Sequence, residues 1–163
     1  LEVNDDYNRG LSQRYVAKLQ PHLPKGASVT VLGLAYKPMS HVIEESPGIY
    51  LCRALSKAGY RVVGHDNLAA KHAESALKMS TLVTDSLSEA LKDADVVLVT
   101  TTDQSYTELT PEQLLHGKSS ITLIDFWRCL KPLGEDPRIN YVPIGRSSES
   151  QHLSGCLKNL WAE

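Results

Sequence analysis

Hydrophobic residues in this sequence follow two recurring patterns, short continuous runs and longer stretches with helical spacing. The continuous runs are rich in β-branched residues, which is typical of strands buried on both faces. They predict strands at residues 28–34, 60–66, 81–84, 95–101, 121–126 and 139–144. The helical spacing predicts helices at residues 5–23, 47–58, 69–78, 86–93, 111–116 and 153–161.

Strands and helices alternate along the chain, and this order predicts βαβ crossovers with a mostly parallel sheet. We expect an α/β, Rossmann-like three-layer fold that is preceded by one N-terminal helix. The expected organisation is a linking helix that ends within 1–26, one folded domain at 27–147, and a C-terminal tail at 148–163 that is helical in part. Ligands of such folds bind beyond the carboxyl ends of the strands. The loops to consider therefore follow Leu34, Asp66, Thr101 and Asp125.

Capping residues mark several predicted helix ends. Ser46 followed by Pro47 is a typical N-cap with proline at the first helical position, and Gly59 suits a left-handed C-terminal end. Residues 86–89 (SLSE) fit a capping box, and Thr110 precedes another proline-initiated helix. These signals support the assigned order of elements.

The turn after the first strand lacks a dinucleotide signature. A Rossmann NAD site places G-x-G-x-x-G there, because glycines let the main chain approach the pyrophosphate. Residues 33–38 read GLAYKP, with one glycine where three are needed. The acidic residue that binds the ribose normally follows after about 20 residues, whereas Asp66 lies much farther along. Asp66 is either a ribose ligand or an ordinary residue at a strand end.

Charge and composition argue against two classes of partner. The 163 residues include 17 Lys+Arg and 19 Asp+Glu, which gives a formal net charge of −2. Nucleic acids and anionic membranes attract basic clusters, and the charges here are mixed in sign along the chain. No apolar stretch approaches the ~20 residues that span a bilayer. We expect neither a nucleic-acid nor a membrane partner.

The cysteines and histidines predict neither disulfides nor a metal site. Three cysteines, Cys52, Cys129 and Cys156, are odd in number and far apart, which is typical of reduced core thiols. With an acidic beginning that does not resemble a signal peptide, they predict a cytoplasmic protein. The six histidines show no ligand spacing with carboxylates or cysteines.

The loop after the first strand contains candidate ligand-binding groups. Lys37 follows the strand end directly and suits a phosphate or a sugar hydroxyl, while Tyr36 offers an aromatic face for a base or ribose. The helix that starts at Ser46 adds free N–H groups with partial positive charge. The alternative is that Lys37 is a solvated loop residue and Tyr36 covers the sheet edge. Trp127 is expected to pack rather than to stack on a ligand.

Five motifs occur in the order found in one enzyme family. Together they cover nearly the whole chain to about Arg146, and the sequence resembles the C-terminal domain of the UDP-glucose/GDP-mannose dehydrogenase family. The motifs are GLAYKP at 33–38 with ESP at 45–47, the strand DVVLV at 95–99, TDQSY at 102–106, ID at 124–125, and YVPIGR at 141–146.

The resemblance implies a role in nucleotide-sugar oxidation. The family oxidises the C6 alcohol of a nucleotide sugar to a carboxylate by two hydride transfers to NAD, through a thiohemiacetal on a cysteine. Its C-terminal domain holds the nucleotide part of the sugar, while the NAD domain and the nucleophilic cysteine lie upstream. For this chain the resemblance implies a UDP- or GDP-sugar ligand, NAD only in the parent enzyme, no catalytic residue, and a homodimer formed through the linking helix.

The resemblance also assigns the candidate substrate-binding residues. Lys37 falls on the lysine of the family that contacts substrate, Tyr36 on its aromatic neighbour, and Gly33 on the glycine of the turn. Ser46 matches as well, either as a substrate contact or as a helix cap alone. Arg128 corresponds to the arginine of a D-G-R-N turn, displaced by one position.

Three departures from the family pattern favour a second hypothesis. His41 and Val42 replace an acidic pair, Glu44 replaces an arginine and so reverses a charge, and the turn at 125–128 reads DFWR. Because a one-residue shift moves a side chain to the other face of a strand, Arg128 needs a bulge or turn to reach the site. The alternative is a degenerate, non-catalytic member of the fold that serves as an interaction or dimerisation module.

Overall fold

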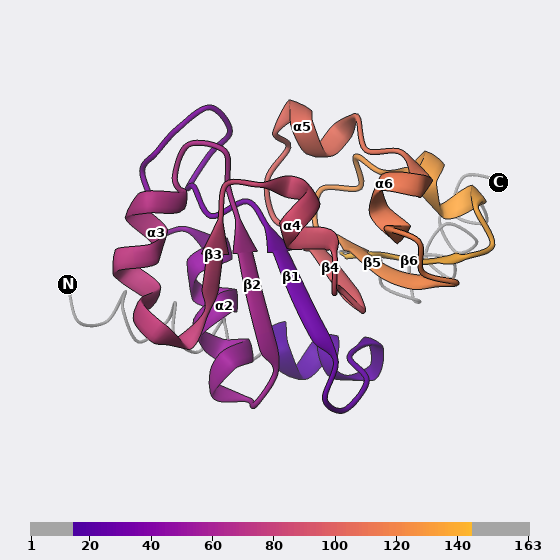
Figure 1. Cartoon of the computed structure of the whole chain (residues 1–163), viewed down its shortest axis with the longest axis horizontal. Coiled ribbons are helices and arrows are strands. Elements are labelled where there is room, and N and C mark those ends of the chain that lie inside the picture. Colours follow the sequence, from indigo (N-terminus) through magenta and orange to yellow (C-terminus); the bar gives the residue numbers. More distant parts are fainter. Residues whose placement is uncertain (1–14, 145–163) are drawn as a thin grey trace, which may run out of the picture.

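The computed structural model describes residues 15–144, which form a three-layer α/β fold around one sheet. Six strands run parallel in the spatial order β3-β2-β1-β4-β5-β6 (Figure 1). They are β1 (Ser28–Leu32), β2 (Arg61–His65), β3 (Leu82–Thr84), β4 (Val96–Val99), β5 (Ile121–Asp125) and β6 (Ile139–Pro143). The Rossmann-like prediction is confirmed, and the sheet of the described residues is entirely parallel.

Helices cover both faces of the sheet. Residues 15–22, α2 and α3 pack on one face, and α4, α5, α6 and η3 pack on the other. The elements are η1 (Gln20–His22), α2 (Pro47–Lys57), α3 (Ala70–Leu77), η2 (Lys78–Ser80), α4 (Leu87–Leu91), α5 (Gln104–Thr107), α6 (Pro111–Leu115) and η3 (Lys131–Glu135). None of these helices is long and apolar enough to cross a membrane. The beginning of the predicted helix 5–23 and the predicted helix 153–161 lie outside the described residues.

The central strands are buried on both faces because each face packs on a helical layer. Val96 and Leu98 belong to the core beneath α2, whereas Val97 and Val99 belong to the core beneath α6. All four side chains are fully buried. Since burying a side chain of this size stabilises the fold by about 1.5–3 kcal/mol, the continuous apolar run accounts for the position of β4 at the centre.

Local capping signals confirm most predicted helix ends. The Ser46 hydroxyl accepts from the Ile49 N–H at the start of α2, and Thr110 forms a complete capping box with Gln113 at α6. The box predicted at α4 is half formed, because Ser86 accepts from the Glu89 N–H while the Glu89 carboxylate accepts from the Thr84 hydroxyl. Helix α5 was not predicted, since four residues are too few to show a helical period.

The strand order reverses between β1 and β4, and this switch point defines the crevice of a doubly wound fold. The connection from β1 leads to α2 on one face, and the connection from β4 leads to α5 and α6 on the other. The two loops therefore diverge at the carboxyl edge of the sheet. This edge is the expected place for a ligand.

The first helical segment runs antiparallel to the strands. Tyr15 packs edge-on against Phe126, just beyond the carboxyl end of β5, with ring centroids 5.9 Å apart. At the other end, the Leu23 carbonyl accepts from the hydroxyl of Tyr60, which precedes β2. From Tyr15 the chain thus runs from the carboxyl edge to the opposite, amino edge, where β1 starts.

Candidate functional site

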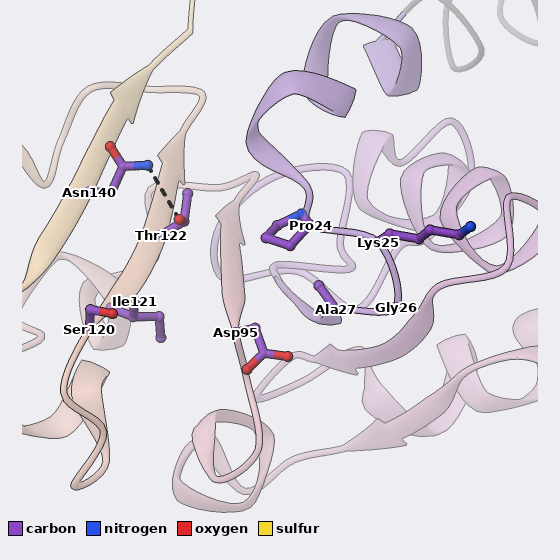
Figure 2. Close-up of a pocket in the computed structure, with 9 residues that line it drawn as sticks. All are labelled: Pro24, Lys25, Gly26, Ala27, Asp95, Ser120, Ile121, Thr122 and Asn140. Atoms are coloured by element: carbon purple, nitrogen blue, oxygen red, sulfur yellow. Dashed lines mark hydrogen bonds between the residues drawn. The ribbon is translucent and has the colours of Figure 1, made fainter.

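A surface pocket opens at the amino edge of the sheet, away from the switch point. It has a volume of about 420 Å³, and Figure 2 shows its lining residues, which come from the starts of β1, β5 and β6 and from the turn before β4. Its one carboxylate, Asp95, accepts from the Ser28 N–H and lies 3.4 Å from the Lys118 ammonium. Because parallel α/β folds bind ligands at the carboxyl edge, we place the candidate site there instead.

The turn after β1 depends on a glycine. Gly33 has φ +102°, and a Cβ placed on it would lie 2.5 Å from the Thr101 hydroxyl oxygen. Thr100 donates its hydroxyl to the Gly33 carbonyl at 2.6 Å, which ties the end of β4 to the end of β1. Gly33 is therefore required both by its backbone conformation and by the close approach of β4. It shapes the predicted site.

Asp66 fixes the same turn from the other side. Its Oδ2 accepts from the main-chain N–H groups of Leu34 and Ala35 at 2.9 and 3.0 Å. Its Oδ1 accepts from the N–H groups of Leu68 and Ala69 at 3.0 and 2.8 Å. Asp66 is buried. Of the two roles considered for it, the structure shows the carboxylate engaged by the protein's own main chain.

Asp125 holds the turn after β5 in a similar way. Its Oδ1 accepts from the N–H groups of Trp127 and Arg128 at 2.9 and 2.7 Å. Its Oδ2 accepts from the Leu130 N–H at 2.8 Å and the Tyr141 hydroxyl at 3.0 Å. The turn includes Arg128 in a left-handed conformation, with φ +57°. A turn is thus present at Arg128, while its role as a ligand-binding residue stays a prediction.

Two cationic side chains lie exposed at this edge. Lys37 follows β1, and Arg128 follows β5. Within residues 15–144, neither side chain has a hydrogen-bond or ion-pair partner, whereas other lysines and arginines such as Lys118 and Arg138 do. Because β4 alone separates β1 from β5, the two strand ends lie about 10 Å apart. Tyr36, beside Lys37, leaves 59% of its surface exposed.

Ser46 is buried and fully engaged as a cap. Its hydroxyl accepts from the Ile49 N–H and donates to the Ala35 carbonyl. The first turn of α2 also lies directly against the protein's own main chain, since a Cβ on Gly48 would lie 2.0 Å from the Gly33 carbonyl oxygen. A carbonyl oxygen therefore occupies the space next to this helix start.

Trp127 is the residue that sequence reasoning placed wrongly. Its ring was expected to pack, yet 59% of its surface is exposed. The indole Nε1–H donates to the Thr100 carbonyl at 2.7 Å, so the ring reaches from the end of β5 across the end of β4. This anchor lies on another strand, and no local pattern in the sequence reveals it.

A buried polar pair, His65 and Tyr106, joins α5 to the end of β2. His65 Nδ1 lies 2.9 Å from the Tyr106 hydroxyl, which donates to the His65 carbonyl. His65 Nε2 pairs with the Asp85 carbonyl at 3.3 Å. Burial lowers the pKa of His65 and raises that of Tyr106, so both groups are neutral near pH 7. This pair holds α5 on the end of β2.

The two described cysteines lack the character of a nucleophile. Burial raises the pKa of Cys52 to about 12. Burial and the Asp125 carboxylate together raise the pKa of Cys129 to about 11. A reactive thiol needs the opposite shift. Residues 15–144 also contain no group of three or more side chains suited to a metal ion.

Two of the three departures from the family pattern lie on the exposed β1–α2 loop. His41, Val42 and Glu44 are all exposed. The imidazole of His41 stacks on that of His72 in α3, with ring centroids 5.4 Å apart. The loop is therefore attached to α3 on the side of α2.

Comparisons with known proteins agree with this architecture. The family model described as the UDP-glucose/GDP-mannose dehydrogenase family, UDP binding domain, matches residues 30–132. A UDP-glucose 6-dehydrogenase of Rhizobium meliloti is 28% identical over 123 residues, which are 76% of this chain and 28% of that relative. A UDP-glucose 6-dehydrogenase of Haloferax volcanii is 34% identical over 113 residues, or 69% of this chain and 26% of the relative. The chain thus spans little more than a quarter of these relatives.

Solved structures share the fold. An NDP-N-acetyl-D-galactosaminuronic acid dehydrogenase from Methanosarcina mazei superposes with a TM-score of 0.69 at 24% identity, covering 93% of this chain and 32% of that one. A UDP-glucose dehydrogenase from Pyrobaculum islandicum gives a TM-score of 0.62 at 22% identity, covering 86% and 29%. At these identities the likeness concerns the fold alone.

Proposed function

The chain belongs to the UDP-glucose/GDP-mannose dehydrogenase family, and on that premise we propose that its carboxyl edge binds the nucleotide part of a UDP- or GDP-sugar. The observation that carries this proposal is Lys37, an exposed cation without a partner among residues 15–144, on the loop that leaves the switch point between β1 and β4. An ammonium there suits a diphosphate. Tyr36, beside Lys37, and Arg128, on the loop after β5, complete the proposed contacts.

The geometry supports a substrate nucleotide rather than NAD as the ligand of this domain. In dinucleotide sites the pyrophosphate lies against the first turn of the helix after β1, and the acidic residue after β2 binds the ribose. Here the Gly33 carbonyl lies against that first turn, and Asp66 already accepts four main-chain hydrogen bonds. Ser46 contributes as the cap that shapes the loop, and Gly33 as its turn.

We assign the oxidation itself to the whole protein. In this proposal an upstream domain supplies NAD and the nucleophilic cysteine, and the sugar C6 alcohol is oxidised to a carboxylate there. Residues 27–147 form the nucleotide-sugar domain, 1–26 continue from a linking helix that supports a homodimer, and 148–163 form the tail. The raised pKa values of Cys52 and Cys129 support the view that this chain has no nucleophile of its own.

Titration calorimetry of the 163-residue chain with UDP and with GDP tests the proposal. We expect one of them to bind, and Lys37→Ala to weaken binding about 10- to 100-fold, the usual contribution of a charged hydrogen bond. Lys92→Ala is the matched control, because Lys92 is exposed at the amino edge. If neither UDP nor GDP produces heat, the result contradicts the proposal and favours the interaction-module alternative.

A further inference from the structure

The Trp127 side chain is exposed to solvent and yet held in place by hydrogen bonds. Its main-chain N–H donates to Asp125 at 2.9 Å, and its indole N–H donates to the Thr100 carbonyl at 2.7 Å. Both partners are buried. An exposed tryptophan that is fixed at two points loses little conformational entropy when a ligand covers it. The ring is therefore prepared for a contact that residues 15–144 do not supply.

The ring is anchored next to the start of the loop that carries Lys37. Trp127 extends from the end of β5 to the end of β4, and Thr100 in turn donates to the Gly33 carbonyl at the end of β1. Lys37 follows on that same β1 loop. One strand spacing, about 5 Å, thus separates the end of β4, where the indole is anchored, from the end of β1, where the loop that carries Lys37 begins.

The free chemistry of the ring is its π face, since the indole N–H is already bound. A nucleoside diphosphate has two parts that match this edge, an anionic diphosphate for Lys37 and a planar base for an aromatic ring. Stacking on an aromatic side chain tolerates any base, because every base has a π face. Resting on the proposed function of the same edge, we propose that Trp127 is the stacking platform for the nucleobase.

Tryptophan fluorescence tests the contact directly. The chain has two tryptophans, Trp127 and Trp161. In the Trp161→Phe variant of the full chain, the emission comes from Trp127 alone. We expect UDP to change this emission with the same midpoint as the calorimetric titration. Inorganic pyrophosphate and glucose 1-phosphate, which lack a base, should leave it nearly unchanged.

Substitution tests the energetic role. Trp127→Ala should weaken UDP binding about 5- to 150-fold, the usual effect of removing one stacked aromatic residue, and should leave the affinity for pyrophosphate unchanged. Trp127→Phe, which keeps a ring, should recover most of the loss. Leu82→Ala is the control, because Leu82 is 68% exposed on β3 at the edge of the sheet. Circular dichroism and thermal melting of each variant establish that it is folded.

The outcomes separate this proposal from the one on which it rests. If wild type binds UDP but Trp127→Ala binds it equally well, stacking is refuted while nucleotide binding stands. If glucose 1-phosphate instead of UDP changes the Trp127 emission, the ring contacts the sugar and the base assignment is wrong. If wild type binds neither diphosphate, both proposals fail together.

Discussion

Two buried aspartates, Asp66 and Asp125, follow β2 and β5 and hold the loops of the carboxyl edge. Asp125 accepts three main-chain N–H bonds from the loop that follows it, and Asp66 accepts two from the loop that follows it and two from the turn after β1. A carboxylate can satisfy several donors at once because it accepts only. The two aspartates therefore position the loops on which we propose the nucleotide site.

Replacing Asp66 by asparagine should destabilise the domain by about 3–5 kcal/mol. The amide keeps one acceptor oxygen, but its NH₂ group then faces two N–H donors. Urea unfolding followed by circular dichroism measures the change. Asp93→Asn, in an exposed turn, should shift the free energy of unfolding by less than about 0.5 kcal/mol. Equal stabilities for the two variants would show that Asp66 does not hold the turn.

His65 makes the stability dependent on pH below neutrality. Burial lowers its pKa, against the opposing effects of the Asp85 carbonyl and the nearby carboxylates of Asp66 and Asp103. As pH falls, the unfolded chain therefore binds the proton first, at the ordinary value of about 6.5. The contribution of His65 to the free energy of unfolding is therefore complete above pH 6.5. Below that pH it is lost by at most about 1.4 kcal/mol per pH unit.

Urea unfolding at pH 7.5 and pH 5.5 tests this dependence. The wild type should be less stable at pH 5.5 by about 1 kcal/mol. His65→Gln should lose most of that difference, whatever its own stability at pH 7.5. His116→Gln is a suitable control, because His116 is exposed. A difference that persists unchanged in His65→Gln would assign the pH dependence to other groups.

Among the elements, α2 and β1 meet more closely than a side chain permits. Gly48 in the first turn of α2 lies against the Gly33 carbonyl, and a Cβ placed on Gly48 would lie only 2.0 Å from that carbonyl oxygen. Alanine in a helix is normally favoured over glycine by about 1 kcal/mol. Gly48→Ala should instead destabilise the domain by about 1–3 kcal/mol, because the new Cβ forces the main chain at Gly33 or Gly48 to move. Thermal melting measures the effect, and a raised melting temperature would contradict it.

Elements were predicted from the sequence where a local pattern determines them. The run of β4 is apolar throughout because both faces of the strand are covered. Ser46 followed by Pro47 identifies the start of α2, because the Ser46 hydroxyl caps an N–H group only three residues farther along the chain. Helix α5 is different, because it is only four residues long and is held by its own Tyr106, whose hydroxyl donates to the His65 carbonyl at the end of β2. The position of α5 depends on its contact with β2, and the residues of α5 alone do not reveal that contact.

The candidate site was predictable only in part for the same reason. Lys37 and Tyr36 adjoin a recognisable strand, so their place at the carboxyl edge follows from the alternation of elements. The exposure of Trp127 and the engagement of Asp66 depend instead on contacts with Thr100 and with the turn after β1. Such contacts between distant segments exist only in the assembled sheet.

For the whole molecule, ligand binding should raise the thermal stability. UDP or GDP at 100 times its dissociation constant adds about 2.7 kcal/mol to the free energy of unfolding. For a chain of this size, that energy raises the melting temperature by about 5–10 °C. Differential scanning fluorimetry with each diphosphate measures the shift, and Lys37→Ala should need a higher ligand concentration for the same shift. Identical shifts in both proteins would exclude Lys37 from the site.

The packing of Tyr15 on Phe126 has a consequence for affinity within a longer protein. Tyr15 lies at the carboxyl edge, the same edge on which we propose the nucleotide site. In a longer protein, an upstream domain joined to this edge by a short tether would face the site at an effective concentration in the millimolar range. An interdomain contact too weak to detect between separate molecules would then be largely formed.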